Sequence, residues 1–362
     1  MSRRPILVMA GGTGGHVYPA LAVAKALQQQ SHEVVWLGTH RGLEARVVPA
    51  NNIEMEWISV GGLRGKNSAT LILAPFRLIW ALAQSLRVMA RHRPAAVLGM
   101  GGFVSGPGGL AAWLMRRPLV IHEQNAIAGL TNRLLARLAR VVLQAFPGSF
   151  SANIETETVG NPVRADIAAL AEPATRFASR EGSLRLLVLG GSQGALALNK
   201  AVPAALARLP EELRPIVRHQ SGSLTIDVAR KAYERESIDV ELVPYIEDMA
   251  DAYAWADLVV CRAGALTVAE LSAAGLPAIF VPYAAAADDH QTANAKPMAE
   301  AGAAAIMAER DLNDESLAGL LQNWLSSRDA LKTRASKARA LHKPDALKRI
   351  TDLCLEAAGA SA

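Results

Sequence analysis

A chain of 362 residues is too long for one ordinary hydrophobic core and fits two domains of roughly 150 to 180 residues each. Its composition, 51% hydrophobic and 20% charged, is that of a well-packed globular protein and excludes extensive disorder. Residues 1–165 carry a net charge of +10 and no Asp, whereas the remainder carries −5. The positive charge of the first half favours an anionic binding partner, which could be nucleic acid, an acidic membrane or a phosphorylated substrate.

The first half alternates short apolar strands with helices. Residues 6–10 form an apolar run that ends in glycines, and residues 19–30 have apolar residues at helical spacing. Further buried strands are predicted at residues 33–37, 95–99 and 119–122. The first apolar run has five residues, too few for a secretory signal, and the two cysteines are far apart in sequence. We therefore expect a parallel sheet in a protein of the reducing cytoplasm.

Residues 71–89 are rich in Leu, Ile and aromatic residues, but Pro75, Arg77 and Arg87 interrupt them. Neither of the charge-free runs around this stretch is long enough to span a bilayer. Two interpretations of this stretch remain open: a helix packed on its own sheet, or a helix that lies at a membrane surface. Basic residues flank the stretch at Arg64, Lys66, Arg77, Arg87, Arg91 and Arg93, and Trp113, Arg116 and Arg117 would extend the patch.

The strand and helix pattern starts again after a hinge near residue 160. A strand at residues 184–189 leads into a glycine loop at residues 190–195 and then a helix. Further strands are predicted at residues 216–219, 240–243, 258–261 and 278–281. The second half is therefore expected to be another doubly wound sheet. The tail, residues 336–362, is predicted to be helical and to pack back on the first domain.

Residues 11–16, Gly-Gly-Thr-Gly-Gly-His, stand where the first strand meets a helix. Glycines let a ligand approach the backbone, and a helix start presents free N–H groups to a phosphate. A dinucleotide oxidoreductase would need an acidic residue at the end of the second strand, but residues 37–40 contain none. Neither glycine loop is followed by Lys-Ser or Lys-Thr, which excludes a P-loop.

A second glycine-rich stretch, residues 99–109, follows the strand at residues 95–99 at the same edge of the sheet. Two neighbouring loops at the carboxyl ends of parallel strands can grip a pyrophosphate through backbone N–H groups. Residues 122–125, His-Glu-Gln-Asn, end the next strand and add polar side chains to this edge. A solvated loop without a binding role would contain the same kinds of residue, so this alternative stays open.

Residues 245–249, 256–270 and 275–278 resemble the donor site of GT-B glycosyltransferases. Together with residues 11–16, 101–109, 122–125, 161–164 and 190–195, they resemble the bacterial N-acetylglucosaminyltransferases of glycosyltransferase family 28, which convert lipid I to lipid II in peptidoglycan assembly. These motifs run in consistent order from residue 11 to about residue 295.

The resemblance implies a GT-B fold, in which two Rossmann-like doubly wound parallel-sheet domains face each other across a cleft. Residues 1–160 would bind the acceptor and the membrane, residues 161–340 the UDP-sugar donor, and residues 341–362 would form the returning helix. It implies inverting transfer from UDP-N-acetylglucosamine to the 4-hydroxyl of an undecaprenyl-linked muramyl-pentapeptide, at the cytoplasmic face of the inner membrane. The implied partners are these two substrates, an anionic membrane surface and cell-wall synthesis proteins, with no nucleic acid, cofactor or metal.

Donor contacts are implied for residues that match the family motifs. Glu270, placed at the start of a helix, would accept bonds from the ribose hydroxyls. The backbone of Ile246 would meet the uracil, Ser192 the diphosphate, and Gln291 the sugar hydroxyls. The remaining implied donor contacts are Thr13, Gly14, Gly15, Asn125, Arg164, Ala265, Leu266, Thr267, Val268 and Ala269.

His16 is our candidate for the base that takes the proton of the acceptor hydroxyl, because an imidazole titrates near working pH. The first domain contains no Asp, and Glu123 is the second candidate. The implied acceptor contacts are Gly12, Gly101, Gly102, Phe103, Ser105 and His122.

Two departures from the family pattern are visible. Phe103 stands where relatives often carry Tyr, and Ala284-Ala285 replaces a Pro and a ring-bearing residue, which puts a sugar contact from that segment in doubt. Three alternatives remain: another glycolipid glycosyltransferase, a UDP-N-acetylglucosamine 2-epimerase, and a nucleic-acid-binding module that uses the basic half.

Overall fold

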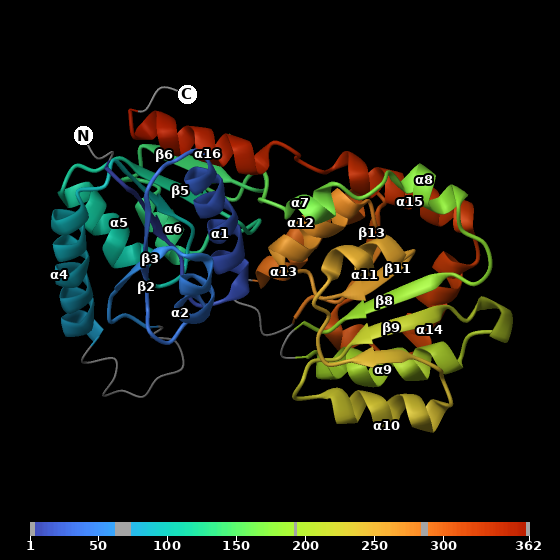
Figure 1. The fold of residues 1–362 in the computed structure, drawn as a ribbon. Coiled ribbons are helices and arrows are strands. Elements are labelled where there is room, and N and C mark those ends of the chain that lie inside the picture. The colour runs from blue at the N-terminus through green and yellow to red at the C-terminus, as the bar shows by residue number, and fades with distance from the viewer. Residues whose placement is uncertain (1–3, 62–73, 192–193, 284–288, 360–362) are drawn as a thin grey trace. The chain divides into compact units, whose positions relative to one another are not determined.

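The computed structural model describes residues 4–61, 74–191, 194–283 and 289–359, and the chain divides into two compact units (Figure 1). The first comprises Met1–Pro162 together with Asp345–Ala362, and the second comprises Val163–Pro344. Ser192, Ala284, Ala285, Asp288, Arg64, Lys66 and the first residues of the predicted helix at 71–89 lie outside the described residues.

The first unit is built on a seven-stranded parallel sheet with the order β3-β2-β1-β4-β5-β6-β7. Its strands are β1 (Ile6–Met9), β2 (Val34–Gly38), β3 (Glu54–Trp57), β4 (Ala96–Gly99), β5 (Leu119–Glu123), β6 (Val141–Gln144) and β7 (Glu157–Thr158). The order reverses between β1 and β4, so the loops after these strands lie next to each other at the carboxyl edge.

Helices cover both faces of this sheet. Ile6 and Val8 pack with α1 and α16, whereas Leu7 and Met9 pack with α4, α5 and α6, because successive side chains of a strand point to opposite faces. The helices are α1 (Gly14–Gln29), α2 (Glu44–Val47), α4 (Ala74–His92), α5 (Ser105–Leu114), α6 (Leu130–Leu135) and α16 (Ala346–Ala357), with a 3₁₀ turn at Pro49–Asn51. Both faces are therefore buried, as the near-continuous apolar strands predict.

The end of the chain belongs to the first unit. α16 contacts α1, β4, β5 and β6, and Ile350, Leu353 and Cys354 are part of the same core as β1 (Figure 1). Arg349 also forms an ion pair with Glu157 of β7 at 2.7 Å. The helix before it, α15 (Arg328–Ala340), packs instead on α8 (Pro173–Ala178) and α12 (Ala265–Ala274) of the second unit. Residues 336–362 therefore contain parts of two helices rather than one.

The second unit has a six-stranded parallel sheet with the order β10-β9-β8-β11-β12-β13. Its strands are β8 (Arg185–Leu189), β9 (Ile216–Gln220), β10 (Glu241–Val243), β11 (Leu258–Cys261), β12 (Ala278–Phe280) and β13 (Ala304–Ile306). The order reverses between β8 and β11, which again places a glycine loop and a helix start side by side.

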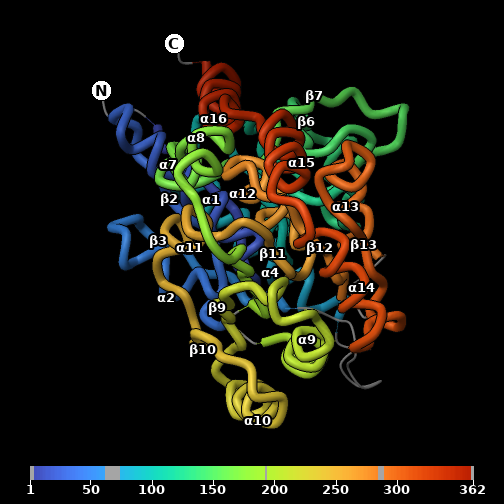
Figure 2. Tube along the Cα trace, turned by 90° about the vertical axis from the view of Figure 1, so that its right-hand side faces the viewer, coloured from blue at the N-terminus to red at the C-terminus, as the bar shows by residue number. Residues whose placement is uncertain are grey.

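Helices surround the second sheet as well. They are α7 (Ala165–Ala168), α8 (Pro173–Ala178), α9 (Leu196–Ala207), α10 (Ile226–Glu236), α11 (Met249–Trp255), α12 (Ala265–Ala274), α13 (His290–Glu300), α14 (Asp314–Leu325) and α15, with 3₁₀ turns at Glu211–Leu213 and Glu309–Asp311. α9 and α10 lie side by side in both views (Figure 1; Figure 2). Leu198, Val202 and Leu206 of α9 pack with α14 over β8.

Two predicted boundaries were wrong. α1 begins at Gly14, five residues before the predicted start, because Pro19 is accommodated inside the helix and does not begin it. His16 therefore lies in the first helical turn. Glu270 is the sixth residue of α12 and not near its start, because the helix begins directly after Gly264.

Candidate functional site

The two glycine loops of the first unit touch through their backbones. Gly102 has a φ of +80°, and a Cβ placed on it would lie 2.2 Å from the carbonyl oxygen of Gly11. Only glycine fits this approach, since both the left-handed backbone and the absence of a side chain are needed. The predicted larger cradle is thus formed by residues 11–15 and 99–102, which follow the neighbouring strands β1 and β4.

Glu44 anchors the first loop, a role that the sequence analysis missed. Its side chain is fully buried and accepts hydrogen bonds from the backbone N–H of Gly12 and from both the N–H and hydroxyl of Thr39, at 2.8–3.0 Å. An acid does therefore reach the end of β2, but its oxygens are used to fix the loop. The sequence predicts no ribose-binding acid there, because residues 37–40 contain none. Glu44 lies four positions further along the chain, and its side chain returns to Thr39 and Gly12.

The N-terminus of α1 opens onto this cradle. Thr13 is the N-cap, makes no capping hydrogen bond with its side chain, and precedes Gly14 and Gly15, whose N–H groups belong to the unbonded first turn. No acidic residue lies in that turn. The partial positive charge of the 16-residue helix is therefore available to an anion.

His16 stands on this first turn with its ring packed against the second glycine loop. A Cβ on Gly101 would lie 2.7 Å from Nδ1 of His16, so the ring occupies the space that a side chain would need. Nδ1 is also 3.0 Å from Oε1 of Gln124, at the end of β5. The side chain is half-buried. His16, Gly101 and Gln124, from three different segments, are thus brought together.

His122 is fully buried behind this group. Its Nε2 lies 2.9 Å from the carbonyl oxygen of Gly160, and its Nδ1 lies 3.1 Å from Nε2 of Gln124. Burial lowers the pKa of His122 to about 4, against the opposing effects of the Gly160 carbonyl and the Glu123 carboxylate. His122 is therefore neutral near pH 7, and its burial argues against the predicted direct contact with the acceptor.

Glu123, the second candidate base, is placed as a structural anchor. It is 2% exposed, and its two oxygens accept four hydrogen bonds from Asn125, Gly129 and Asn132 at 2.9–3.1 Å. Both oxygens of this side chain are thus engaged by donors of the protein itself and do not face a substrate. The geometry thus favours His16 over Glu123 as the proton acceptor.

The other predicted residues of the first unit differ in their exposure. Phe103 is 55% exposed and Asn125 is half-buried, so both can be reached from solvent. Ser105 is fully buried, and its hydroxyl donates to the carbonyl oxygens of Gly101 and Met9. Its position supports a role in holding the glycine loop and argues against the predicted acceptor contact.

In the second unit, the predicted donor residues follow adjacent strands at the carboxyl edge. Gly190 and Gly194 continue from β8, and a Cβ on Gly194 would lie 2.4 Å from the carbonyl oxygen of Ser221, after β9. Ile246, after β10, donates its backbone N–H to Oε1 of Gln220 at 3.0 Å. A uracil that uses this N–H must therefore compete with Gln220, which the sequence analysis did not single out.

α12 brings the remaining donor residues to the same edge. Gly264 is its N-cap, and Ala265, Leu266 and Thr267 form the first turn, ahead of Val268 and Ala269. Glu270 follows one turn later and accepts a hydrogen bond from the hydroxyl of Tyr253 at 3.0 Å. Burial raises the pKa of Glu270, whereas the Tyr253 hydrogen bond and the Arg164 charge act in the opposite direction.

Arg164 and Gln291 also lie in the second unit. Arg164 is the N-cap of α7, pairs with Asp166 at 3.4 Å, and is close enough to influence Glu270 electrostatically. Gln291 accepts a hydrogen bond from the backbone N–H of Tyr283 at 2.9 Å, so its side chain fixes the backbone at Tyr283. The predicted contacts of these two residues with the donor remain predictions.

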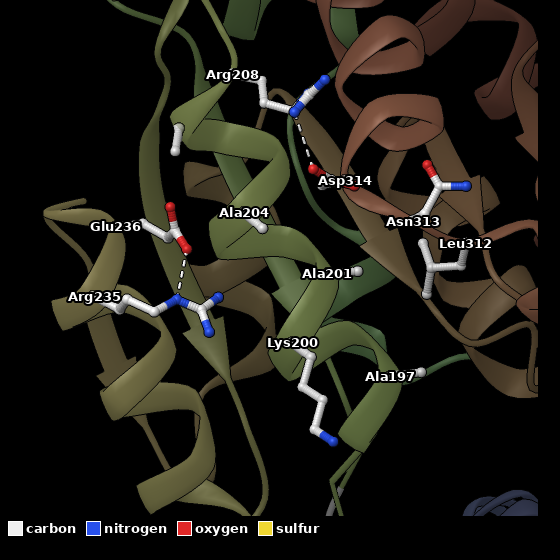
Figure 3. Close-up of a pocket in the computed structure, with 11 residues that line it drawn as sticks. Ala197, Lys200, Ala201, Ala204, Arg208, Arg235, Glu236, Leu312, Asn313 and Asp314 are labelled. Atoms are coloured by element: carbon white, nitrogen blue, oxygen red, sulfur yellow. Dashed lines mark hydrogen bonds and ion pairs between the residues drawn. The ribbon is translucent and has the colours of Figure 1, made fainter.

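Two other features of the described residues have the form of a site. Among the described residues, the three side chains close enough to share a metal ion are Glu54, Glu56 and His92, but Glu56 already pairs with Arg91 and His92 at 3.0 and 2.6 Å. A hollow of about 620 Å³ lies beside α9 and α10 (Figure 3). Four of the five charged residues that line it are paired, as Arg208–Asp314 and Arg235–Glu236, the fifth is Lys200, and no predicted site residue lines it.

Comparison with known proteins matches both units. The model of the glycosyltransferase family 28 N-terminal domain matches residues 6–144, and that of the family 28 C-terminal domain matches residues 185–350. A relative from Alkalilimnicola ehrlichii is 58% identical and covers 98% of this chain and 99% of its own; one from Marinobacter nauticus is 54% identical and covers 98% of each. Both are called UDP-N-acetylglucosamine–N-acetylmuramyl-(pentapeptide) pyrophosphoryl-undecaprenol N-acetylglucosamine transferase.

Solved structures agree with these matches. The crystal structure of MurG from Acinetobacter baumannii is 42% identical, with a TM-score of 0.86 over 98% of this chain and 99% of that one. The calicheamicin glycosyltransferase CalG4 is 18% identical, with a TM-score of 0.69 over 99% of each chain, and shares the fold alone.

Proposed function

The chain belongs to glycosyltransferase family 28, and on this premise we propose that it transfers N-acetylglucosamine from UDP-N-acetylglucosamine to a muramyl-pentapeptide pyrophosphoryl-undecaprenol. The observation that carries the proposal is the identity of 54–58% over nearly the whole chain with relatives that bear this name. The GT-B fold expected from the sequence is confirmed by the two parallel sheets and by the structural neighbours.

The second unit takes the donor in this proposal. Its carboxyl edge supplies a helix N-terminus for the diphosphate and, at Glu270, a carboxylate for two ribose hydroxyls. No metal is needed to balance the leaving UDP, because helix starts and glycine-loop amides stabilise its charge. The guanidinium of Arg164, which acts electrostatically on Glu270 in the same unit, adds a positive charge to this edge.

The first unit takes the acceptor and supplies the base. The 4-hydroxyl of the acceptor loses its proton to His16 while its oxygen forms a bond to the anomeric carbon of the donor sugar. The bond from that carbon to the β-phosphate oxygen breaks, and UDP leaves with the electron pair. Attack from the face opposite to UDP inverts the anomeric centre. The half-buried ring of His16 supports this role better than the fully engaged Glu123 does.

Peripheral binding to an anionic membrane, at its cytoplasmic face, completes the proposal. No described helix combines the length and hydropathy that crossing a membrane requires. α4 buries Ala81, Val88 and Met89 in the unit but leaves Phe76, Ile79 and Trp80 61–69% exposed. α5, which contacts α4, adds the half-exposed Trp113. Both interpretations of this stretch are therefore part of the proposal: one face of α4 packs in the unit, and the other is apolar and carries arginines nearby in the sequence, at Arg77 and Arg87.

A transfer assay with purified protein tests the function. We expect radiolabelled N-acetylglucosamine to pass from UDP to the undecaprenyl-linked muramyl-pentapeptide, with UDP released in equal amount. No transfer to this acceptor, together with turnover of a different glycolipid, would overturn the proposed substrate. Conversion of UDP-N-acetylglucosamine alone into its 2-epimer would overturn the reaction class.

A further inference from the structure

A chain of hydrogen bonds runs from the backbone of residue 160 to the ring of His16. The carbonyl oxygen of Gly160 faces Nε2 of His122 at 2.9 Å, Nδ1 of His122 faces Nε2 of Gln124 at 3.1 Å, and Oε1 of Gln124 faces Nδ1 of His16 at 3.0 Å. His122 and Gln124 are buried, with exposures of 0% and 1%. Water therefore does not replace the partners within this chain.

The direction of the Gln124 amide follows from its surroundings. Nε2 also lies 3.2 Å from the carbonyl oxygen of His122, which can only accept a hydrogen bond. The opposite orientation would place two carbonyl oxygens against each other in a buried site. The NH₂ end therefore points to His122, and the oxygen points to His16.

The proton of His122 is fixed in the same way. Its Nε2 faces the carbonyl oxygen of Gly160 and must carry the hydrogen. Because burial lowers the pKa of His122 to about 4, the ring is neutral near pH 7 and its Nδ1 is an acceptor. Among the described residues, the carboxylates next to these hydrogen bonds include Glu123, bonded to Asn125, Gly129 and Asn132, and Glu44, bonded to Gly12 and Thr39.

We propose that Gln124 and His122 are positioning residues that hold His16 with its proton on Nδ1 and leave Nε2 free to accept the proton of the acceptor hydroxyl. The catalytic part of this inference rests on the proposed function. The oxygen of Gln124 can only accept, so a neutral His16 must donate through Nδ1. Gly101 packs against the ring and limits its rotation. An amide orients the base without adding a negative charge beside it.

Nitrogen NMR of the histidine rings tests the tautomer directly, without substrate. At pH 8, we expect the His16 signals of the wild-type protein to show a protonated Nδ1 and an unprotonated Nε2, with assignment by loss of the signals in His16→Gln. Gln124→Leu should give a mixture of the two tautomers, because it removes the acceptor. A wild-type His16 protonated on Nε2, or a tautomer unchanged in Gln124→Leu, would overturn the relay.

Kinetics test its consequence. Gln124→Leu should lower kcat by about 10-fold or more and leave the KM for UDP-N-acetylglucosamine unchanged. Gln124→Glu should move the acidic limb of the kcat/KM profile to higher pH, because a carboxylate favours the protonated imidazole. The matched control is Gln144→Leu, at the end of the neighbouring strand β6, where the glutamine is also buried and bonded at both ends of its amide.

The two proposals can fail separately. Normal transfer with a kcat, pH profile and tautomer that are the same in wild type, Gln124→Leu and Gln144→Leu contradicts the relay and leaves the function standing. Equal losses of kcat in Gln124→Leu and Gln144→Leu indicate a general packing defect and also contradict it. No transfer by the wild-type protein contradicts the function, and the NMR measurement still decides the tautomer.

Discussion

The hydroxyl of Tyr253 donates a 3.0 Å hydrogen bond to Oε2 of Glu270 and thereby joins α11 to α12. Tyr253 is buried, and burial raises its pKa well above the usual range, so the hydroxyl keeps its proton and remains a donor. One carboxylate oxygen is thus fixed in place, and the side chain is oriented before any nucleotide arrives.

This relationship predicts graded losses of UDP affinity. Glu270→Ala should weaken UDP binding by about 10- to 100-fold, the effect of losing a charge-assisted hydrogen bond, and Tyr253→Phe should weaken it by only a few-fold. Isothermal titration calorimetry measures both. Glu241→Ala, an acidic surface residue of the same unit that pairs with Arg218, serves as the control. Unchanged affinity in Glu270→Ala would remove the proposed ribose contact.

His16→Ala should lower turnover by about 100-fold or more if His16 is the base. UDP affinity should stay near the wild-type value, because the proposed uridine contacts belong to the second unit. Single-turnover measurement of sugar transfer, beside calorimetry with UDP, separates the two effects. Turnover close to that of the wild type would exclude His16 as the base and return the assignment to the other polar residues of the first unit.

Gly101→Ala should also impair catalysis, for a steric reason. The new Cβ would lie 2.7 Å from Nδ1 of His16, on a backbone with a φ of +94°. The ring must then move from its present position, and we expect a fall in kcat of about 10-fold or more with little change in UDP affinity. Gly61→Ala, where a Cβ meets nothing within 4 Å, is the control. Equal activity of the two variants would contradict the close packing.

The strands and glycine loops could be predicted from the sequence because their signals are local. Short apolar runs identified β1, β4, β8 and β11, a glycine ends or directly follows the first three of these runs, and parallel pairing then placed their loops at one edge within each sheet. β3, β6, β7 and β13 were not predicted; β3 is half-exposed with two Glu residues, β7 has only two residues, and β13 is rich in alanine. The Glu-Met-Glu-Trp sequence of β3 does alternate, but over only four residues, and β13 has only three.

The supporting residues of the site could not be predicted, because their roles depend on contacts between distant segments. Gln124 reaches His16 across 108 positions, and Asn161 donates to the carbonyl of Gln124 from 37 positions away. Glu123 was the second candidate base from its sequence context, but its side chain is directed toward Asn132 and bonded there. Side-chain direction follows from packing in three dimensions, which periodicity does not describe.

His219 should make the second unit sensitive to acid. It is fully buried, its Nδ1 faces the hydroxyl of Tyr233 at 2.9 Å, and burial lowers its pKa to about 3. The unfolded chain takes up this proton near pH 6.5, whereas the folded protein does not until about pH 3. Stability present above pH 6.5 is therefore lost as the pH falls toward 3, by about 5 kcal/mol.

His219→Phe removes this titration and should flatten the pH dependence of unfolding between pH 6.5 and 4. Urea unfolding, followed at several pH values in that range, measures it. His32→Asn, which changes a histidine that is not fully buried, should keep the wild-type slope. Identical slopes for wild type and His219→Phe would show that this buried imidazole does not contribute to acid sensitivity.

The exposed apolar face of α4 should decide binding to anionic vesicles. Ile79 and Trp80 are 65% and 61% exposed, and burying such side chains in the interfacial region contributes roughly 1.5–3 kcal/mol each. The double variant Ile79→Ser, Trp80→Ser should therefore lose about 10-fold or more of its affinity for vesicles with anionic lipid in a sedimentation assay. The control is Leu224→Ser, which changes an 83% exposed leucine of the second unit. The arginines remain in the double variant, so an unchanged affinity would mean that charge alone holds the protein at the membrane. An equal loss in Leu224→Ser would mean that α4 has no special role.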